Sequence, residues 1–251
     1  ICLFFNIIIT LKEYNNISEL PPKLSVFPLP GALLLPRTQL PLNIFEPRYL
    51  EMIDDALSDN RLIAMIQTQA DNKGQLFKIG CVGKIVSYNE LTNNRMLITL
   101  SGVCRFSVGQ ELEVVTPYRQ FQVDYSEFSN DLLKGFDEEK VDREKLQACL
   151  KKYLDHNNLE VDWESIKNSP TELLVNSLCL WSPYRPEEKQ ALLEAKTLSE
   201  RNEILIAMTE MSMSSEGGTE QIQWDKYDKR NWSEIIRNTS LPNYERNPYL
   251  G

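Results

Sequence analysis

The sequence predicts an α+β protein in which a β-rich first half precedes a helical second half. Between residues 24 and 125, apolar residues form short runs or alternate with polar residues, which is typical of strands. From about residue 142 onward they recur every three or four positions, which is typical of helices. The 251 residues, 42% of them hydrophobic, are enough for one large domain or two small ones.

Short strands are predicted throughout the first half. Prolines interrupt its opening segment, so strands there should be short, bent or at an edge. Gly80 and Gly83 indicate a bend or bulge, and the polar turn Thr92-Asn93-Asn94 indicates a hairpin. Many short strands of this kind favour a small barrel or folded sheet. The predicted strands cover residues 24–29, 32–35, 40–45, 62–67, 76–88, 96–100, 103–108, 111–115 and 118–125.

One helix is expected within this β-rich half. Glu46-Pro47-Arg48 opens it with a proline in the first turn, where the missing N–H has no intrahelical partner to lose. An apolar stripe then follows at helical spacing, formed by Tyr49, Leu50, Ile53, Ala56 and Leu57.

The second half predicts four or five short helices between residues 139 and 214. In the segment Ser169-Pro170-Thr171-Glu172 we expect a capping box, with Ser169 as the cap and Glu172 reaching back to it. The acidic triplet Asp137-Glu138-Glu139 is interpreted as a solvated loop and helix start. The predicted divisions are an N-terminal extension (1–21), a β subdomain (22–128), a helical subdomain (129–214) and a linker with a polar tail (215–251).

The charge balance disfavours general nucleic-acid binding, which needs a cationic surface to neutralise phosphates. The chain has 27 basic and 36 acidic residues, a net charge of −9. Residues 1–125 hold 11 basic and 12 acidic side chains, so most of the excess acid lies in the second half. The apolar residues 1–11 are too short to span a bilayer and lack the features of a signal peptide.

No catalytic residue, metal site or cofactor is predicted. The single histidine, His156, lies at a polar helix end, where a cation suits the helix dipole. The sequence has no phosphate-binding P-loop and no G-x-S-x-G nucleophile motif. Its five cysteines are widely spaced, without the short pairs that zinc sites need. The expectation is buried, unreactive thiols in a reduced, cytoplasmic protein.

The segment from residue 27 to 49 is chemically unusual. It has five prolines, many large apolar side chains and only three charges, so it could pack as core or line a groove for extended peptides. Glu46, Pro47 and Arg48 are interpreted as a structural motif at the helix start. The residues predicted to shape an apolar binding surface are Leu40, Leu42, Ile44, Phe45 and Tyr49.

Four strings carry a family resemblance: F-P-L-P-G at 27–31, I-F-E-P-R-Y at 44–49, I-G-C-V-G at 79–83 and L-I-T-L-S-G-V-C-R-F at 97–106. Over about residues 22–212 the chain resembles the Lon N-terminal domain family, the substrate-binding domain of Lon-type ATP-dependent proteases. The resemblance implies a PUA-like β-barrel subdomain followed by a helical bundle. It also implies recognition of unfolded or extended polypeptide segments without chemistry.

The sequence lacks the AAA+ ATPase and Ser-Lys protease modules of full-length Lon, and it looks like the stand-alone bacterial proteins that carry only the substrate-binding domain. We therefore expect a non-enzymatic protein-binding or peptide-binding module, with an adaptor role in protein quality control as a hypothesis. The first alternative is an unrecognised hydrolase with a site between the two subdomains. The second is RNA binding by the PUA-like barrel.

Overall fold

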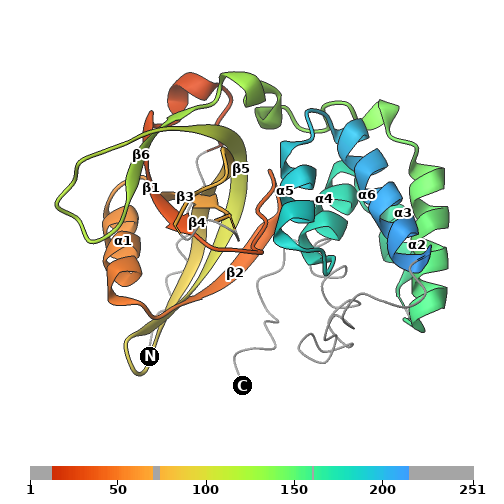
Figure 1. Cartoon of the computed structure of the whole chain (residues 1–251), viewed down its shortest axis with the longest axis horizontal. Coiled ribbons are helices and arrows are strands. Elements are labelled where there is room, and N and C mark those ends of the chain that lie inside the picture. Colours follow the sequence, from red (N-terminus) through yellow and green to blue (C-terminus); the bar gives the residue numbers. More distant parts are fainter. Residues whose placement is uncertain (1–12, 70–73, 160, 215–251) are drawn as a thin grey trace, which may run out of the picture.

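The computed structural model describes residues 13–69, 74–159 and 161–214 (Figure 1). A six-stranded sheet with one helix forms one side of the molecule, and the C-terminal helices form the other (Figure 1). The α+β class and the order of the two halves are therefore confirmed. The strands are β1 (Lys23–Pro28), β2 (Gln39–Ile44), β3 (Leu62–Ile66), β4 (Ile79–Leu91), β5 (Arg95–Glu111) and β6 (Gln120–Asp124).

The sheet curls into a near-closed ring. Its strand order is β2-β5-β4-β3-β1-β6, and β6 also pairs with the C-terminal part of β5. All strands except β2 thus belong to the ring, and β2 is attached to the N-terminal part of β5 outside it. The pairing of β1 with β3 is parallel, and the other pairings are antiparallel.

Strand β5 corrects the prediction of two separate strands at 96–100 and 103–108, because it runs unbroken through Gly102. At this position the Leu35 backbone crosses the strand, and a Cβ atom on residue 102 would lie 2.0 Å from the Leu35 carbonyl oxygen. The glycine permits this close approach instead of ending the strand. The predicted bulge at Gly83 is confirmed by a register shift between Val82 and Gly83.

The predicted strands at 32–35 and 111–115 are wrong. Residues 33–35 are buried, but they form a loop whose backbone is bonded locally. The Thr38 hydroxyl accepts from the Leu35 N–H at 3.1 Å and donates to the Leu35 carbonyl at 2.7 Å, which replaces the bonds of a strand. After Glu111 the chain leaves the sheet in an exposed loop that ends at β6.

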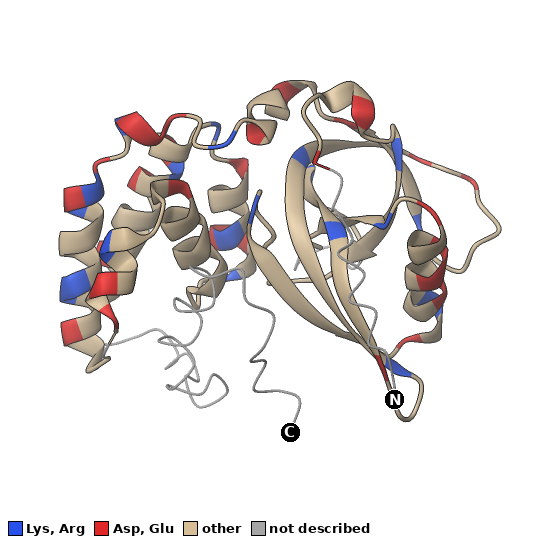
Figure 2. Cartoon of the chain, turned by 180° about the vertical axis from the view of Figure 1, so that it is seen from behind, with Lys and Arg blue, Asp and Glu red and all other residues tan. Residues whose placement is uncertain are grey.

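Helix α1 (Pro47–Ser58) begins with Pro47 in its first turn, as predicted. It buries Tyr49, Met52, Ile53 and Ala56 against the sheet. Its opposite face carries Glu51, Asp54 and Asp55, so acidic side chains predominate on this helix (Figure 2). This division between the two faces is the amphipathic pattern that the spacing indicated.

The second half contains helices α2 to α6, in agreement with the predicted helical region. Short 3-10 helices lie at Ile17–Glu19, Ser126–Leu132 and Glu138–Lys140. His156 lies in the last turn of α2, at the helix end where its residue type suits the dipole. The helix bounds are α2 (Arg143–Asn157), α3 (Trp163–Asn168), α4 (Thr171–Trp181), α5 (Pro186–Glu194) and α6 (Leu198–Ser214).

The capping box predicted at Ser169 is wrong. Pro170 occupies the N-cap of α4, and the Ser169 hydroxyl donates to the Ser165 carbonyl at 2.6 Å. The Glu172 carboxylate is instead bonded to Arg37 from the β-rich half. A tertiary ion pair thus replaces the local cap.

Two acids of the triplet cap helices. Its interpretation as solvated is therefore wrong for the buried Asp137, whereas the expected helix start is present as the 3-10 helix Glu138–Lys140. The Glu138 carboxylate accepts from the Glu172 N–H at 2.6 Å, at the start of α4. The Asp137 carboxylate accepts from the Ser199 N–H at 3.2 Å, at the start of α6, and Asp137 is only 4% exposed. These two acids therefore satisfy N–H groups that each helix leaves unpaired at its start.

One apolar cluster extends through both halves of the molecule. It joins Leu34, Met52 and Ile85 of the β-rich half to Leu174 and Ile206 of the helices. A second cluster, which includes Val26, Val82 and Phe106, lies within the β-rich half. The predicted subdomain boundary at residues 128 and 129 falls inside the 3-10 helix Ser126–Leu132 and stays a prediction. Among the described residues no helix is long and apolar enough to cross a membrane.

Candidate functional site

The unusual proline-rich segment leads from the junction of the two halves to the far end of the sheet. Its last part consists of β2, the connecting residues Phe45 and Glu46, and the first turn of α1. Phe45 follows the last residue of β2 and is 61% exposed, which is high for a phenylalanine. The guanidinium of Arg95 lies over its ring, 6.0 Å from the centroid. This segment thus presents an aromatic ring to solvent on a strand-to-helix connection.

The other predicted surface residues lie mostly inside the protein. Leu42, Ile44 and Tyr49 are buried, and Leu40 is partly buried against the same apolar cluster. Tyr49 packs edge-on against Phe27 with ring centroids 4.5 Å apart. The packing of these four side chains fixes the position of the segment, and Phe45 is the most exposed member of the set.

Glu46 and Arg48 contact one another across Pro47. The Arg48 guanidinium donates to the Glu46 carboxylate at 3.0 Å from Nε and 2.7 Å from Nη2. It also lies 4.5 Å from the centroid of the Tyr49 ring. Because about half of each charged side chain is exposed, the ion pair contributes at most about 1 kcal/mol to stability. The contacts hold the turn before α1 in one shape, and the structural role assigned to these three residues stays a prediction.

Strand β2 begins at a polar junction between the two halves. Arg37, which has a φ of 65°, binds both carboxylate oxygens of Glu172 on α4. Its Nη1 also donates to the Asp131 carbonyl at 2.6 Å. Glu172 in turn accepts from the Gly135 N–H at 3.2 Å. The guanidinium therefore joins the loop before β2, the chain after β6 and the helical half.

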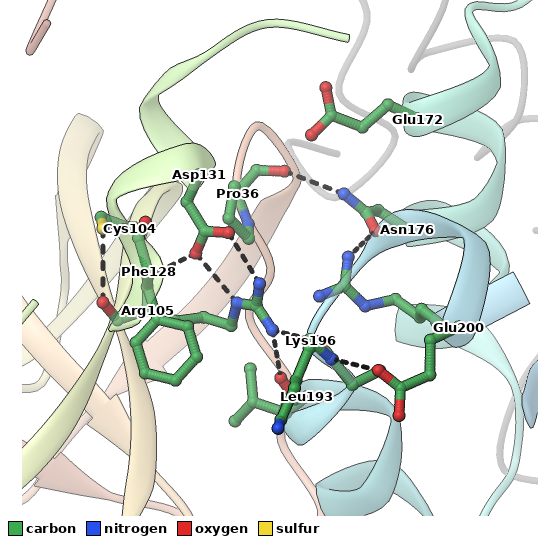
Figure 3. A network of polar contacts seen from close by, with 12 residues as sticks. Pro36, Cys104, Arg105, Phe128, Asp131, Glu172, Asn176, Leu193, Lys196 and Glu200 are labelled. Atoms are coloured by element: carbon green, nitrogen blue, oxygen red, sulfur yellow. Dashed lines mark hydrogen bonds and ion pairs between the residues drawn. The ribbon is translucent and has the colours of Figure 1, made fainter. Parts of the chain in front are cut away.

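A buried ion pair stands beside it (Figure 3). The Arg105 guanidinium on β5 donates to both oxygens of Asp131, at 2.9 and 2.8 Å, and to the carbonyls of Leu193 and Ala195. The Phe128 ring covers its other side, 4.6 Å from the guanidinium carbon. Arg105 is 4% exposed, so every polar contact that it makes is inside the protein.

Arg201 on α6 is a second buried cation at the junction. Its Nε donates to the Leu192 carbonyl and its Nη1 to the Asn176 side chain, both at 2.9 Å. Asn176 donates onward to the Pro36 carbonyl at 3.3 Å, which reaches the β-rich half (Figure 3). Burial, with the nearby charge of Arg105, lowers the pKa of Arg201 to about 10.

Helix α5 is bonded to the sheet through two glutamines. The buried Gln67 side chain donates to Gln190 at 3.1 Å and accepts from the Gly31 N–H at 2.9 Å. Gln190 donates to the Ile79 carbonyl at 3.1 Å. The junction, where the hydrolase alternative would place its site, thus holds polar side chains that bond one another or nearby carbonyls, while among the described residues the buried Arg201 Nη2 and Asn202 Oδ1 have no hydrogen-bond partner.

Arg105, Asp131 and Arg201 have structural roles that no motif in the sequence indicated. A usable signal existed for Arg105, because a charge within the clean alternation of residues 103–108 marks a strand position that can be buried. Asp131 and Arg201 carry no such signal, since their neighbours in the sequence are ordinary for a loop and a helix.

The thiols and potential metal ligands are placed as follows. Cys81, Cys104, Cys149 and Cys179 are buried and unpaired, and burial raises the pKa of each of their thiols. Cys2 lies outside the described residues. Within the described part of the chain, no group of three or more His, Cys, Asp or Glu side chains is placed to hold a metal ion.

The family comparison matches most of the chain. The model of the ATP-dependent protease La (LON) substrate-binding domain matches residues 23–210.

Curated relatives and solved structures agree with this match. A Lon protease of Dictyoglomus thermophilum is 26% identical over 199 residues, which cover 77% of this chain and 23% of the relative. Lon protease 2 of Myxococcus xanthus is 27% identical over 207 residues, which cover 77% of this chain and 24% of the relative. The chain therefore spans about a quarter of the length of these relatives.

Two solved structures share the fold. A Lon N-terminal domain protein from Xanthomonas campestris has a TM-score of 0.53 at 18% identity, covering 74% of this chain and 97% of that one. The N-terminal domain of a Mycobacterium avium complex Lon protease has a TM-score of 0.55 at 16% identity, covering 75% of this chain and 98% of that one.

Proposed function

Because the chain belongs to the family of LON substrate-binding domains, we propose that it binds polypeptide segments in an extended or unfolded state without altering them chemically. The motifs of the sequence had indicated this family over about residues 22–212, and the family match extends over 23–210. The relatives carry the same region within much longer proteases, so binding is the activity proposed for the matched region itself.

The observation that carries the proposal is the exposure of Phe45 beside apolar neighbours that are buried. A phenylalanine that is 61% exposed leaves apolar surface in water, although its neighbours Ile44 and Tyr49 are buried. Since those neighbours fix the backbone on both sides, the ring is held in place before a ligand arrives. Rigidly presented aromatic rings are common anchors in protein recognition.

Two further parts of the proposal concern the location of the protein and an adaptor role. A cytoplasmic location fits the described cysteines, which are unpaired as a reducing compartment would keep them. An adaptor role, in which bound segments are passed to a protease, would require a second contact surface. We propose that role as a consequence of polypeptide binding, to be tested after it.

The test measures binding of an unfolded protein. Reduced and carboxymethylated lysozyme, labelled with a fluorophore, is titrated with the full chain and followed by anisotropy, with native lysozyme as the folded comparison. We expect saturable binding of the unfolded form only. Phe45→Asp should weaken it by about tenfold or more, because it replaces an apolar anchor by a charge.

The matched control is Met211→Asp, which places the same charge on α6 in the helical half at a side chain that is 70% exposed. This variant should bind the unfolded lysozyme with the affinity of the wild type. Equal affinity of the wild type and Phe45→Asp would show that Phe45 is not the anchor. Absence of any binding of the unfolded protein would overturn the proposed function.

A further inference from the structure

Within the described ranges, strand β2 has a neighbouring strand on one side only. Among the described residues it pairs with β5 and with no other strand, and it lies at the end of the strand order. The ring of the barrel closes without it, because β6 pairs with β5 farther along that strand. The second side of β2 is thus a sheet edge, with backbone groups that no other strand in the described part of the chain uses.

The residues that face this open edge follow from the pairing with β5. The Gly102 N–H donates to the Thr38 carbonyl at 2.9 Å, so the backbone of residue 38 points toward β5. Successive residues of a strand direct their N–H and C=O groups to opposite sides. Leu40, Leu42 and Ile44 therefore bond β5, and the backbone groups of Gln39, Pro41 and Asn43 point to the open edge.

Pro41 sets the pattern of backbone hydrogen-bond donors and acceptors along this edge. Proline has no N–H, so its position on the outward side leaves no donor unpaired, and this is where strands tolerate it. The open edge offers an N–H and a carbonyl at Gln39, only a carbonyl at Pro41, and an N–H and a carbonyl at Asn43. The three side chains are exposed.

The edge also has defined ends. It starts two residues after Arg37, which is bonded to Glu172 of the helical half, and it finishes one residue before the exposed Phe45. A strand of this length extends about 20 Å. An extended segment lying along it would run from the junction of the two halves to the aromatic ring.

We propose that an extended polypeptide segment binds as an added strand on the open edge of β2, with one end of the segment against Phe45. This inference rests on the proposed function and specifies how the bound segment is held. An antiparallel segment would form two hydrogen bonds at Gln39, one at the Pro41 carbonyl and two at Asn43. The carbonyl of the ligand residue opposite Pro41 remains without a protein donor.

The same pattern disfavours a second copy of this chain as the occupant. Two β2 strands related by a two-fold axis through Pro41 would place the two prolines opposite each other. Neither proline could donate, so that pair would form no hydrogen bond. A two-fold axis through Leu42 would instead set each Pro41 opposite Asn43, and each of those two pairs would lose one of its two hydrogen bonds. An ordinary segment supplies an N–H opposite Pro41, which makes a foreign extended chain the better partner for this edge.

Amide hydrogen exchange tests the inference on the unmodified protein. The exchange rates of the backbone amides in the full chain are measured by NMR, first without a ligand and then with saturating reduced and carboxymethylated lysozyme. Exchange of the Gln39 and Asn43 amides should slow by about tenfold or more, because these N–H groups become hydrogen-bonded. The amides of Leu40, Leu42 and Ile44 already bond β5 and serve as the internal control, with exchange unchanged.

A pair of variants at one position gives the second readout. Asn43→Pro removes the outward N–H, and Asn43→Ala removes the side chain but keeps the N–H. Affinity for the unfolded lysozyme should be about fivefold or more lower in Asn43→Pro than in Asn43→Ala, because only the proline variant lacks the outward N–H. Melting temperatures of both variants report whether the fold is intact, and the exchange experiment decides the case if Asn43→Pro does not fold.

The outcomes separate this inference from the proposed function. If the unfolded lysozyme binds but leaves the Gln39 and Asn43 amides unprotected, the added-strand mode is wrong and polypeptide binding stands. If a lower affinity appears equally in Asn43→Ala and Asn43→Pro, the side chain and not the backbone is recognised, which also overturns the inference. If the unfolded lysozyme does not bind at all, the proposed function and this inference both fail.

Discussion

Arg37 and Glu172 form a two-point ion pair across the junction of the two halves, although 135 residues separate them in the chain. Arg37 lies in the loop that leads into β2, and Glu172 lies in the first turn of α4. The pair therefore links the start of the proposed binding edge to the helical half. Its partly buried carboxylate makes it stronger than an ordinary surface pair.

We expect Glu172→Gln to lower the free energy of unfolding by about 1–2 kcal/mol, because it weakens charged hydrogen bonds to Arg37. Urea denaturation at neutral pH measures the change. The matched control is Glu188→Gln, which weakens the more exposed pair with Arg185 and should cost less than about 0.5 kcal/mol. Equal losses in both variants would contradict a special role for the Arg37–Glu172 pair.

Asp131→Asn should be more damaging, with a loss of about 3–5 kcal/mol, because it leaves the buried Arg105 charge without its carboxylate. The double variant Arg105→Leu, Asp131→Leu removes both charges and should be less destabilised than the sum of the two single variants. A double-mutant cycle in urea gives the coupling energy. Additive losses would mean that the two side chains stabilise the fold independently.

Gly102→Ala should destabilise the protein by about 2 kcal/mol or more, since the new methyl group would meet the Leu35 carbonyl oxygen at 2.0 Å. Gly31→Ala is the control. Its Cβ would have no neighbour within 4 Å, but the φ of +74° adds strain of about 1 kcal/mol. In thermal and urea unfolding, Gly102→Ala should therefore be less stable than Gly31→Ala. The reverse order would contradict the close approach of the Leu35 carbonyl to residue 102.

The raised pKa of the Tyr118 hydroxyl predicts that the folded protein loses stability at alkaline pH. Burial raises its pKa to about 12, and the hydrogen bond that its hydroxyl donates to Asp55 at 2.5 Å adds to the effect. Since the pKa in the folded state exceeds the value of about 10 in the unfolded chain, this contribution is complete below pH 10 and is lost as the pH rises to 12.

Urea unfolding of the wild type and Tyr118→Phe at pH 8, 10 and 11.5 tests this. The wild type should be the more stable protein at pH 8, and the difference should shrink at the higher pH values. A constant difference across this range would show that the Tyr118 hydroxyl does not titrate with unfolding.

Local signals predicted much of the fold. Pro47 and the apolar stripe behind it gave helix α1, and the asparagines of the β4–β5 turn, which both have positive φ, gave the hairpin. These features depend on residues a few positions apart, so the sequence alone displays them. The F-E-P-R-Y string also led to the correct family.

Partners from distant parts of the chain explain what the sequence did not reveal. Glu172 has the residue type and spacing of a local cap, but its carboxylate finds Arg37 instead, and Glu138 caps the helix in its place. Packing between distant segments also decides which residues of the predicted binding surface are exposed. The apolar residues around Phe45 look alike in the sequence, and only the packing shows that Leu42, Ile44 and Tyr49 face inward.

The apolar cluster that joins Leu34 and Ile85 to Leu174 and Ile206 has a thermodynamic consequence. Neither half encloses that cluster alone, so separating them would expose its side chains to water. The loss of one half's packing must therefore destabilise the other, and the two halves should unfold in a single cooperative transition.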